Sequence, residues 1–261
     1  MTRPVLALTD AGGPAEAPLV VLGNSLGTST ILWDEVVPAL GITFRVRAFD
    51  LPGHGVSPAA SEPFRVADLA DALADEIAEP FHYAGVSLGG AVGLELALRH
   101  PAVVRSATIL ASGAKIGTAE GWHERAAQVR QQSTSSLIIA SAGRWFAPDT
   151  IARNPDLTGR LLHSLRDADA ESYALCCEAL AAHDLRDRLS EITVPVQAVW
   201  GGHDQVTPET LAREIADGVA RGRATGIPTA AHLPPADDPA ATATMIADFV
   251  SEIERTTDDT A

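Results

Sequence analysis

Residues 85–89, from Gly85 to Gly89, fit the pattern G-x-S-x-G around Ser87. The residues before it, 81–86, are predicted to form a short strand, and residues 88–100 are predicted to form a helix. A serine on a tight turn from strand to helix is strained and exposes its hydroxyl, while the helix N-terminus offers N–H groups to an oxyanion. Ser87 is therefore predicted to be a nucleophile. The alternative is a turn of small residues that contains a serine.

A serine hydroxyl is a weak nucleophile at neutral pH, so Ser87 needs a base and a group that orients the base. His232 follows the last predicted strand, and Asp204 follows the strand that ends at Gly201. Both are expected at carboxyl ends of strands, where open α/β sheets gather their functional groups. The order Ser87, Asp204, His232 is typical of hydrolases with this nucleophile turn.

Other residues compete for the roles of base and acid. His54 follows an earlier strand but precedes Ser87, so a role in loop structure is expected for it. His203 adjoins Asp204 and is the alternative base. Asp50 is the alternative acid, although its position before Ser87 is again out of order.

The glycine-rich segment 23–27, which follows an early predicted strand, is the candidate oxyanion loop. One oxyanion donor is expected to be the N–H of Leu88, directly after the nucleophile, and the other the backbone N–H of Ser25. An ordinary glycine-rich turn into a helix is the alternative.

The bulk composition limits the class of protein. The chain has 261 residues and a net charge of −15, which suits one large α/β domain and argues against nucleic acid or an anionic membrane as a partner. Cys176 and Cys177 cannot build a disulfide framework, and no signal peptide, membrane span or zinc spacing is visible, so a cytoplasmic protein without a metal is expected. A monomer or a small homo-oligomer is compatible with these features.

Strands and helices alternate along most of the chain, which predicts a mostly parallel sheet with helices on both faces. The alternation stops between about residues 112 and 192, where only helical runs such as 121–132 and 171–183 occur. We expect a core of residues 1–112 and 193–261 with an inserted helical lid, residues 113–192. The predicted strands are 4–10, 18–23, 44–49, 81–86, 105–111, 194–201 and 224–231. The predicted core helices begin at Ser29, Val66, Leu88, Thr207-Pro208 and Asp238-Pro239.

Four segments carry a family resemblance: Asn24 to Thr28 with Trp33-Asp34, Ala114 to Thr118 with Trp122, Arg144 to Pro148, and Ala231 to Leu233 around the predicted base. They resemble 3-oxoadipate enol-lactonases, a family with the α/β-hydrolase fold. The resemblance covers nearly the whole chain, but Pro234-Pro235 after the histidine departs from the family pattern. It implies an α/β-hydrolase fold with an inserted helical lid, and a Ser-His-Asp mechanism that needs no cofactor and no metal.

The resemblance also implies a substrate, a small anionic enol-lactone that is hydrolysed to 3-oxoadipate. Its carboxylate needs a cation, and Arg144 beside Trp145 is the first candidate, ahead of Lys115 and Arg130. The alternative for Arg144 is a surface arginine whose stem covers Trp145. Three tryptophans are candidates for lining the pocket, with packing as the alternative: Trp33, Trp122 and Trp145.

Other functions remain open for the same triad. They include a general carboxylesterase, a hydrolase of carbon–carbon bonds and a serine-dependent haloperoxidase. Haloalkane dehalogenases and epoxide hydrolases of this fold use an aspartate nucleophile, so Ser87 argues against them. A ligand-sensing receptor on a hydrolase fold belongs to a different class, and sustained turnover would distinguish it from an enzyme.

Overall fold

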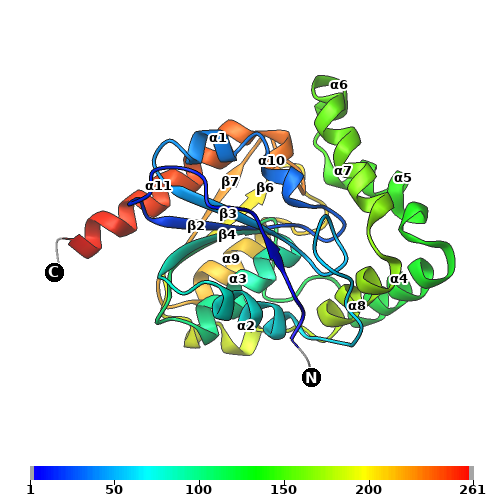
Figure 1. Cartoon of the computed structure of the whole chain (residues 1–261), viewed down its shortest axis with the longest axis horizontal. Coiled ribbons are helices and arrows are strands. Elements are labelled where there is room, and N and C mark those ends of the chain that lie inside the picture. The colour runs from blue at the N-terminus through cyan, green and yellow to red at the C-terminus, as the bar shows by residue number, and fades with distance from the viewer. Residues whose placement is uncertain (1–2, 259–261) are drawn as a thin grey trace.

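The computed structural model describes residues 3–258, which form a seven-stranded sheet in the order β1-β3-β2-β4-β5-β6-β7 (Figure 1). β1 pairs with β3 in antiparallel fashion, and all the other neighbouring pairs are parallel. The predicted mostly parallel α/β-hydrolase sheet is therefore confirmed. The strands are β1 (Ala7–Leu8), β2 (Leu19–Gly23), β3 (Arg45–Asp50), β4 (Phe81–Val86), β5 (Val104–Leu110), β6 (Val196–Gly201) and β7 (Gly222–Ile227).

Helices cover both faces of the sheet (Figure 1). Helices α2, α3 and α9 lie on one face, with α3 against β4 and β5 and α9 against β6 and β7, while α1 and α11 pack together on the other face. None of the described helices combines the length and apolarity needed to cross a bilayer. The core helices are α1 (Val37–Leu40), α2 (Val66–Glu76), α3 (Leu88–Arg99), α9 (Glu209–Gly218), α10 (Pro234–Asp237) and α11 (Pro239–Asp258).

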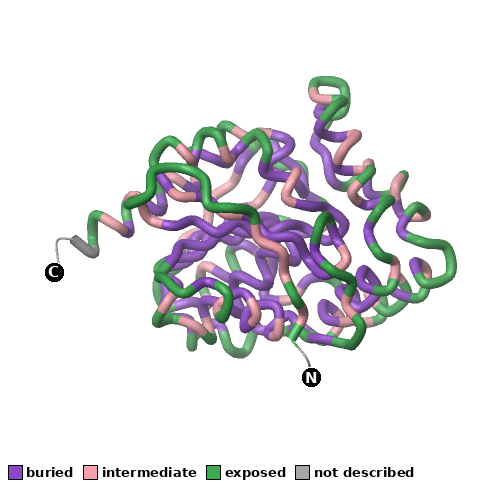
Figure 2. Tube along the Cα trace, in the orientation of Figure 1, coloured by how far each residue is buried: buried purple, intermediate pink, exposed green. Residues whose placement is uncertain are grey.

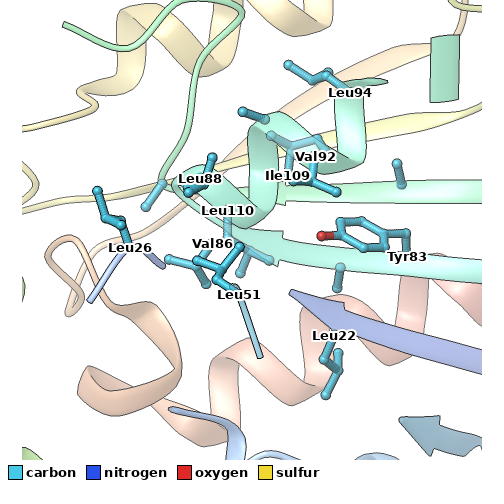
Figure 3. Packing of buried hydrophobic residues seen from close by; sticks show 14 of the residues in the cluster. Leu22, Leu26, Leu51, Tyr83, Val86, Leu88, Val92, Leu94, Ile109 and Leu110 are labelled. Atoms are coloured by element: carbon cyan, nitrogen blue, oxygen red, sulfur yellow. The ribbon is translucent and has the colours of Figure 1, made fainter. Parts of the chain in front are cut away.

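The central strands are buried on both faces, because helices cover both sides of a parallel sheet. Every residue of β2 and β4 is buried, so these strands show no alternation of buried and exposed positions (Figure 2). Tyr83, Val92 and Ile109 pack where α3 crosses the sheet, and Leu22 lies on the opposite side of the sheet (Figure 3). This packing fixes the end of β4 and the start of α3, where the predicted nucleophile lies.

The segment between β5 and β6 contains helices and no strand in residues 111–195, all of which are described. In Figure 1 these helices lie to one side of the sheet, and α4 packs along α8. We keep the name lid for residues 113–192. Its helices are α4 (Ala119–Gln132), η2 (Thr134–Leu137), α5 (Ile138–Trp145), α6 (Thr150–Arg153), α7 (Pro155–Asp167), α8 (Ala170–Ala181) and η3 (Arg186–Glu191).

The single helix predicted from Ser29 to Leu40 is wrong, because the structure has two short helices there. A 3₁₀ helix, η1, covers Thr30–Trp33, and α1 begins only at Val37. Pro38 has no N–H for a hydrogen bond to the preceding turn, so the segment breaks and the proline takes a place in the first turn of α1.

Candidate active site

Ser87 lies on the turn between β4 and α3, as the sequence predicts. Its φ of 56° and ψ of −114° are strained for a residue with a side chain. A Cβ atom on Gly85 would come within 2.4 Å of the carbonyl oxygen of Gly89, so only glycine fits there. The backbone N–H of Ser87 donates to Leu110, and the Ser112 hydroxyl donates to the Ser87 carbonyl. These contacts hold the strained turn in place.

Asp204 and His232 meet as predicted, each in a loop that follows a strand at the same edge of the sheet. His232 Nδ1 lies 3.0 Å from Asp204 Oδ2, and both residues are buried. Burial alone would raise the pKa of Asp204, but the hydrogen bond and charge of His232, helped by other donors, lower that pKa to about 2. Asp204 is therefore a carboxylate that can orient the imidazole and stabilise its protonated form.

Thr207 contributes to this arrangement in a way that the sequence analysis missed. The helix predicted to begin at Thr207-Pro208 begins at Glu209, and no side chain caps it. The Thr207 hydroxyl instead donates to Asp204 Oδ2 at 2.6 Å, while the N–H of Val206 donates to Oδ1 at 2.7 Å. A buried carboxylate needs such donors, and this need outweighs the capping preference of a threonine before proline.

The two alternative histidines lie elsewhere. His54 is buried, its Nε2 accepts a hydrogen bond from the N–H of Gly27 at 3.1 Å, and its Nδ1 lies 2.9 Å from the carbonyl oxygen of Pro52. Burial lowers its pKa to about 4, so His54 is neutral and supports the loop, as expected. His203 is exposed to solvent, whereas its neighbour Asp204 is buried.

Asp50, the alternative acid, has a structural role. Its carboxylate is buried and accepts hydrogen bonds from the N–H groups of Thr30 and Val56, at 2.8 Å and 2.9 Å, and from the side chain of Asn24. It therefore joins the loops after β2 and β3. The histidine–aspartate pair of the site uses Asp204 instead.

The candidate oxyanion loop, residues 23–27, offers two free N–H donors in addition to that of Leu88. The N–H of Gly27 donates to His54 and that of Thr28 donates to the Ser25 carbonyl. Within residues 3–258, no hydrogen-bond acceptor is found for the N–H groups of Ser25, Leu26 or Leu88. Ser25 and Leu26 both line the cavity at Ser87, so Leu26 is a second candidate that the sequence analysis did not consider.

A cavity of about 220 Å³ lies between the core and the lid. Ser87 and His232 line it from the core, and Trp122, Arg144 and Trp145 line it from the lid. The prediction that Trp33 lines this pocket is wrong, because its side chain is fully buried in the core and does not reach the cavity. Its position near the oxyanion loop in sequence did not reveal which way the side chain points.

Of the three candidate cations, only Arg144 lines the cavity. Arg144 lines the cavity and is partly exposed, and its Nε donates to the Ala140 carbonyl at 3.1 Å. Lys115 pairs with Asp184 instead, at 3.2 Å. Arg130 is held by two glutamates of α8. Neither Lys115 nor Arg130 lines the cavity.

Arg125 is a cavity residue that the sequence analysis missed. It lies three positions after Trp122 on α4, and residues at this spacing share a helix face. Its guanidinium lies 5.0 Å from the centre of the Trp122 ring. The spacing from Trp122 was the available signal, but it identifies a pocket residue only when one knows which face of α4 lies over Ser87.

The fold, the nucleophile turn and the Asp204–His232 pair together define a hydrolase that acts on esters. The sequence profile of the alpha/beta hydrolase fold matches residues 18–239. The chain belongs to this α/β-hydrolase family.

Two curated groups of relatives have similar identity to the chain. It is 36% identical to 3-oxoadipate enol-lactonase 2 of Acinetobacter baylyi over 75% of the chain and 74% of that protein. It is 33% identical to a pimeloyl-[acyl-carrier protein] methyl ester esterase of Neisseria meningitidis over 92% of the chain and 96% of that protein. The crystal structure of the enol-lactonase from Burkholderia xenovorans LB400 matches with a TM-score of 0.89 and 32% identity, covering 94% of this chain and 96% of that one.

Proposed function

We propose that this protein hydrolyses a carboxylate-bearing enol-lactone, 3-oxoadipate enol-lactone, to 3-oxoadipate through an acyl-enzyme on Ser87. Similarity to the enol-lactonases of Acinetobacter baylyi and Burkholderia xenovorans supports this substrate. A small cavity that combines a nucleophile with a cation suits a compact anionic lactone.

The observation that carries the proposal is the position of Arg144. Its guanidinium shares a cavity with Ser87 and His232 and forms no ion pair with any described residue. The chain has a net charge of −15, so carboxylates are plentiful, and a cation left without one in a cavity can bind an anionic ligand. Arg144 is partly exposed, so we expect its contact to be weakened by solvent.

In the proposed reaction, His232 takes the proton of the Ser87 hydroxyl, and the oxygen attacks the lactone carbonyl. The N–H groups of Leu88 and of Ser25 or Leu26 stabilise the tetrahedral oxyanion. The ring oxygen leaves as an enolate and takes the proton from His232, and the resulting enol tautomerises to a ketone. His232 then activates water, which releases the second carboxylate from Ser87.

Hydrolysis of a pimeloyl-type methyl ester is the second candidate, because the Neisseria esterase aligns with 92% of the chain. The same triad would form an acyl-enzyme and release methanol. The two functions differ at the far end of the substrate, which is a free carboxylate in the lactone and a long carrier-linked chain in the ester. A cation in the cavity favours the lactone.

A panel of substrates tests the proposal. Purified protein is assayed with 3-oxoadipate enol-lactone, the isomeric muconolactone, a neutral aryl ester and a pimeloyl thioester methyl ester. We expect the highest kcat/KM for the enol-lactone and sustained turnover. A higher kcat/KM for the methyl ester would favour the second candidate, and a single turnover would indicate a receptor.

A further inference from the structure

Two arginines, rather than one, face the cavity. Arg125 of α4 and Arg144 of α5 both line it, and neither forms an ion pair with any residue between 3 and 258. Arg130, five residues after Arg125 on the same helix, is instead bound by Glu171 and Glu178. Arg125 is thus left without a carboxylate on a helix where a neighbouring arginine has two.

The Arg125 side chain is held in place on the wall of the cavity. Its guanidinium lies 5.0 Å from the centre of the Trp122 ring, within the range of a cation–π contact. Burial raises the pKa of the Tyr173 phenol, and Arg125 opposes this rise through its charge and a hydrogen bond. An aromatic ring and a phenol leave the positive charge uncompensated, so the group is positioned for an anion.

Arg125 also acts on its neighbour. Burial and then the like charge of Arg125 lower the pKa of Arg144. Two guanidinium groups that repel each other across a cavity are stabilised when one anion binds to both. Arg125 is half-buried and Arg144 is exposed, so solvent screens Arg125 less.

We propose that Arg125 and Arg144 together bind a single substrate carboxylate. The cavity therefore takes small acids that present a hydrolysable acyl carbon to Ser87 and a free carboxylate to this arginine pair. Only the identification of that acyl group as an enol-lactone rests on the proposed function. Arg125 is a binding residue that sets preference for anionic over neutral substrates.

The first test measures binding without turnover. Adipate and its neutral analogue adipamide are titrated into the purified protein by calorimetry. We expect adipate to bind, adipamide to bind at least 10-fold more weakly, and Arg125→Met to weaken adipate binding by roughly 10-fold or more. Arg130→Met is the matched control on α4 and should bind adipate as the unchanged protein does. Unaltered adipate affinity in Arg125→Met would overturn the proposal.

The second test asks whether the two arginines share one anion. Arg125→Met, Arg144→Met and the double variant are compared on the charged lactone and on a neutral ester. With a shared carboxylate, the double variant loses less kcat/KM than the product of the two single losses, because each single change already weakens the same contact. Losses that multiply would show two separate sites and contradict the shared carboxylate.

A purely structural role for Arg125 gives a different pattern. Loss of the Trp122 contact alone would lower activity on charged and neutral substrates alike. Arg125→Lys keeps the charge and the ring contact but not the two-pronged geometry, so it should recover anion preference only in part. Full recovery in Arg125→Lys would also contradict the shared, two-pronged contact.

These outcomes can be separated from failure of the proposed function. If adipate binding depends on both arginines while the enol-lactone is not hydrolysed, the arginine site stands and the lactone assignment falls. If the lactone is hydrolysed but Arg125→Met changes neither adipate binding nor selectivity, the lactone assignment stands and the arginine pair falls.

Discussion

The Oδ2 atom of Asp237 accepts a hydrogen bond at 2.7 Å from the backbone N–H of Ala231, the residue before His232. Its Oδ1 atom accepts another, at 2.9 Å, from the N–H of Ala147 in the lid. The N–H of Leu233 donates to the Trp145 carbonyl at 3.0 Å beside them. The buried carboxylate of Asp237 therefore joins the lid segment after Arg144 to the loop that carries His232.

Replacement of Asp237 should disturb both segments. Asp237→Asn keeps the size but turns one acceptor into a donor that faces an N–H group, so we expect a loss of about 1.5–3 kcal/mol in the free energy of unfolding. The kcat on charged and neutral substrates should fall together, because the His232 loop serves both. Denaturant unfolding and steady-state kinetics measure these effects.

Asp238→Asn is the matched control, since Asp238 caps α11 at Ala241 and bonds Thr229 rather than the lid. Asparagine caps a helix about as well as aspartate, so this variant should have nearly unchanged stability and nearly unchanged kcat. An Asp237→Asn enzyme with normal kcat would show that the link to the lid is dispensable for catalysis.

Ser87 should be the acylated residue. Ser87→Ala is expected to lower kcat by 10⁴-fold or more, on the order seen when a triad nucleophile is removed. A fluorophosphonate should label Ser87, as read by peptide mass, and the label should be absent in the variant. Labelling of another residue at an unchanged rate would refute the assignment.

Asp204 and Asp50 should differ in their effect on catalysis. Asp204→Asn removes the acceptor that fixes the His232 tautomer, and we expect a loss of kcat of about 10⁴-fold. Asp50→Asn should mainly lower stability, because its buried carboxylate holds the N–H groups of Thr30 and Val56. Near-normal kcat in Asp204→Asn together with an inactive Asp50→Asn would reverse the assignment.

The placement of the three candidate triad residues could be predicted from sequence because each follows a strand, and the carboxyl ends of parallel strands meet at one edge of the sheet. Local patterns around Ser87, Asp204 and His232 were sufficient for this. The lid side of the site could not be predicted in the same way. How the helices pack against one another decides whether Arg125 lines the cavity at Ser87 and whether Trp33 is buried in the core. No local sequence pattern encodes that packing.

The same limit explains Thr207. A threonine before a proline predicts a helix cap from local propensity. In the folded chain the hydroxyl lies beside Asp204, and a buried carboxylate binds it at 2.6 Å. The sequence around Thr207 does not show that the Asp204 carboxylate is buried and needs a donor. Only the structure therefore reveals that the hydroxyl binds Asp204 instead of capping the helix.

Stability should fall on acidification from about pH 6.5 to pH 4. Burial lowers the pKa of His54 and of His183 to about 4. In this window the unfolded chain binds protons that the folded chain does not, so each histidine costs up to about 1.4 kcal/mol per pH unit as the pH falls. His183 has two ring nitrogens without a hydrogen bond among the described residues.

His183→Leu tests this linkage. The variant should show a shallower loss of unfolding free energy between pH 7 and pH 5 than the unchanged protein, measured with urea. Its kcat should stay normal, because His183 lies against Glu95, at 3.5 Å, and not in the cavity. An unchanged pH slope would mean that His183 titrates alike in the folded and unfolded states.

The last prediction concerns Arg144 and the proposed lactone. Arg144 is partly exposed, so solvent screening places its contact at the low end for a charge-assisted hydrogen bond, about 1.5 kcal/mol. Arg144→Met should therefore lower kcat/KM on the charged lactone by roughly 10-fold. A neutral ester of similar size should be affected little, because the triad is unchanged, and this comparison separates loss of the cation from misfolding. If both substrates lose activity equally, Arg144 supports the lid through its bond to Ala140 rather than binding the carboxylate.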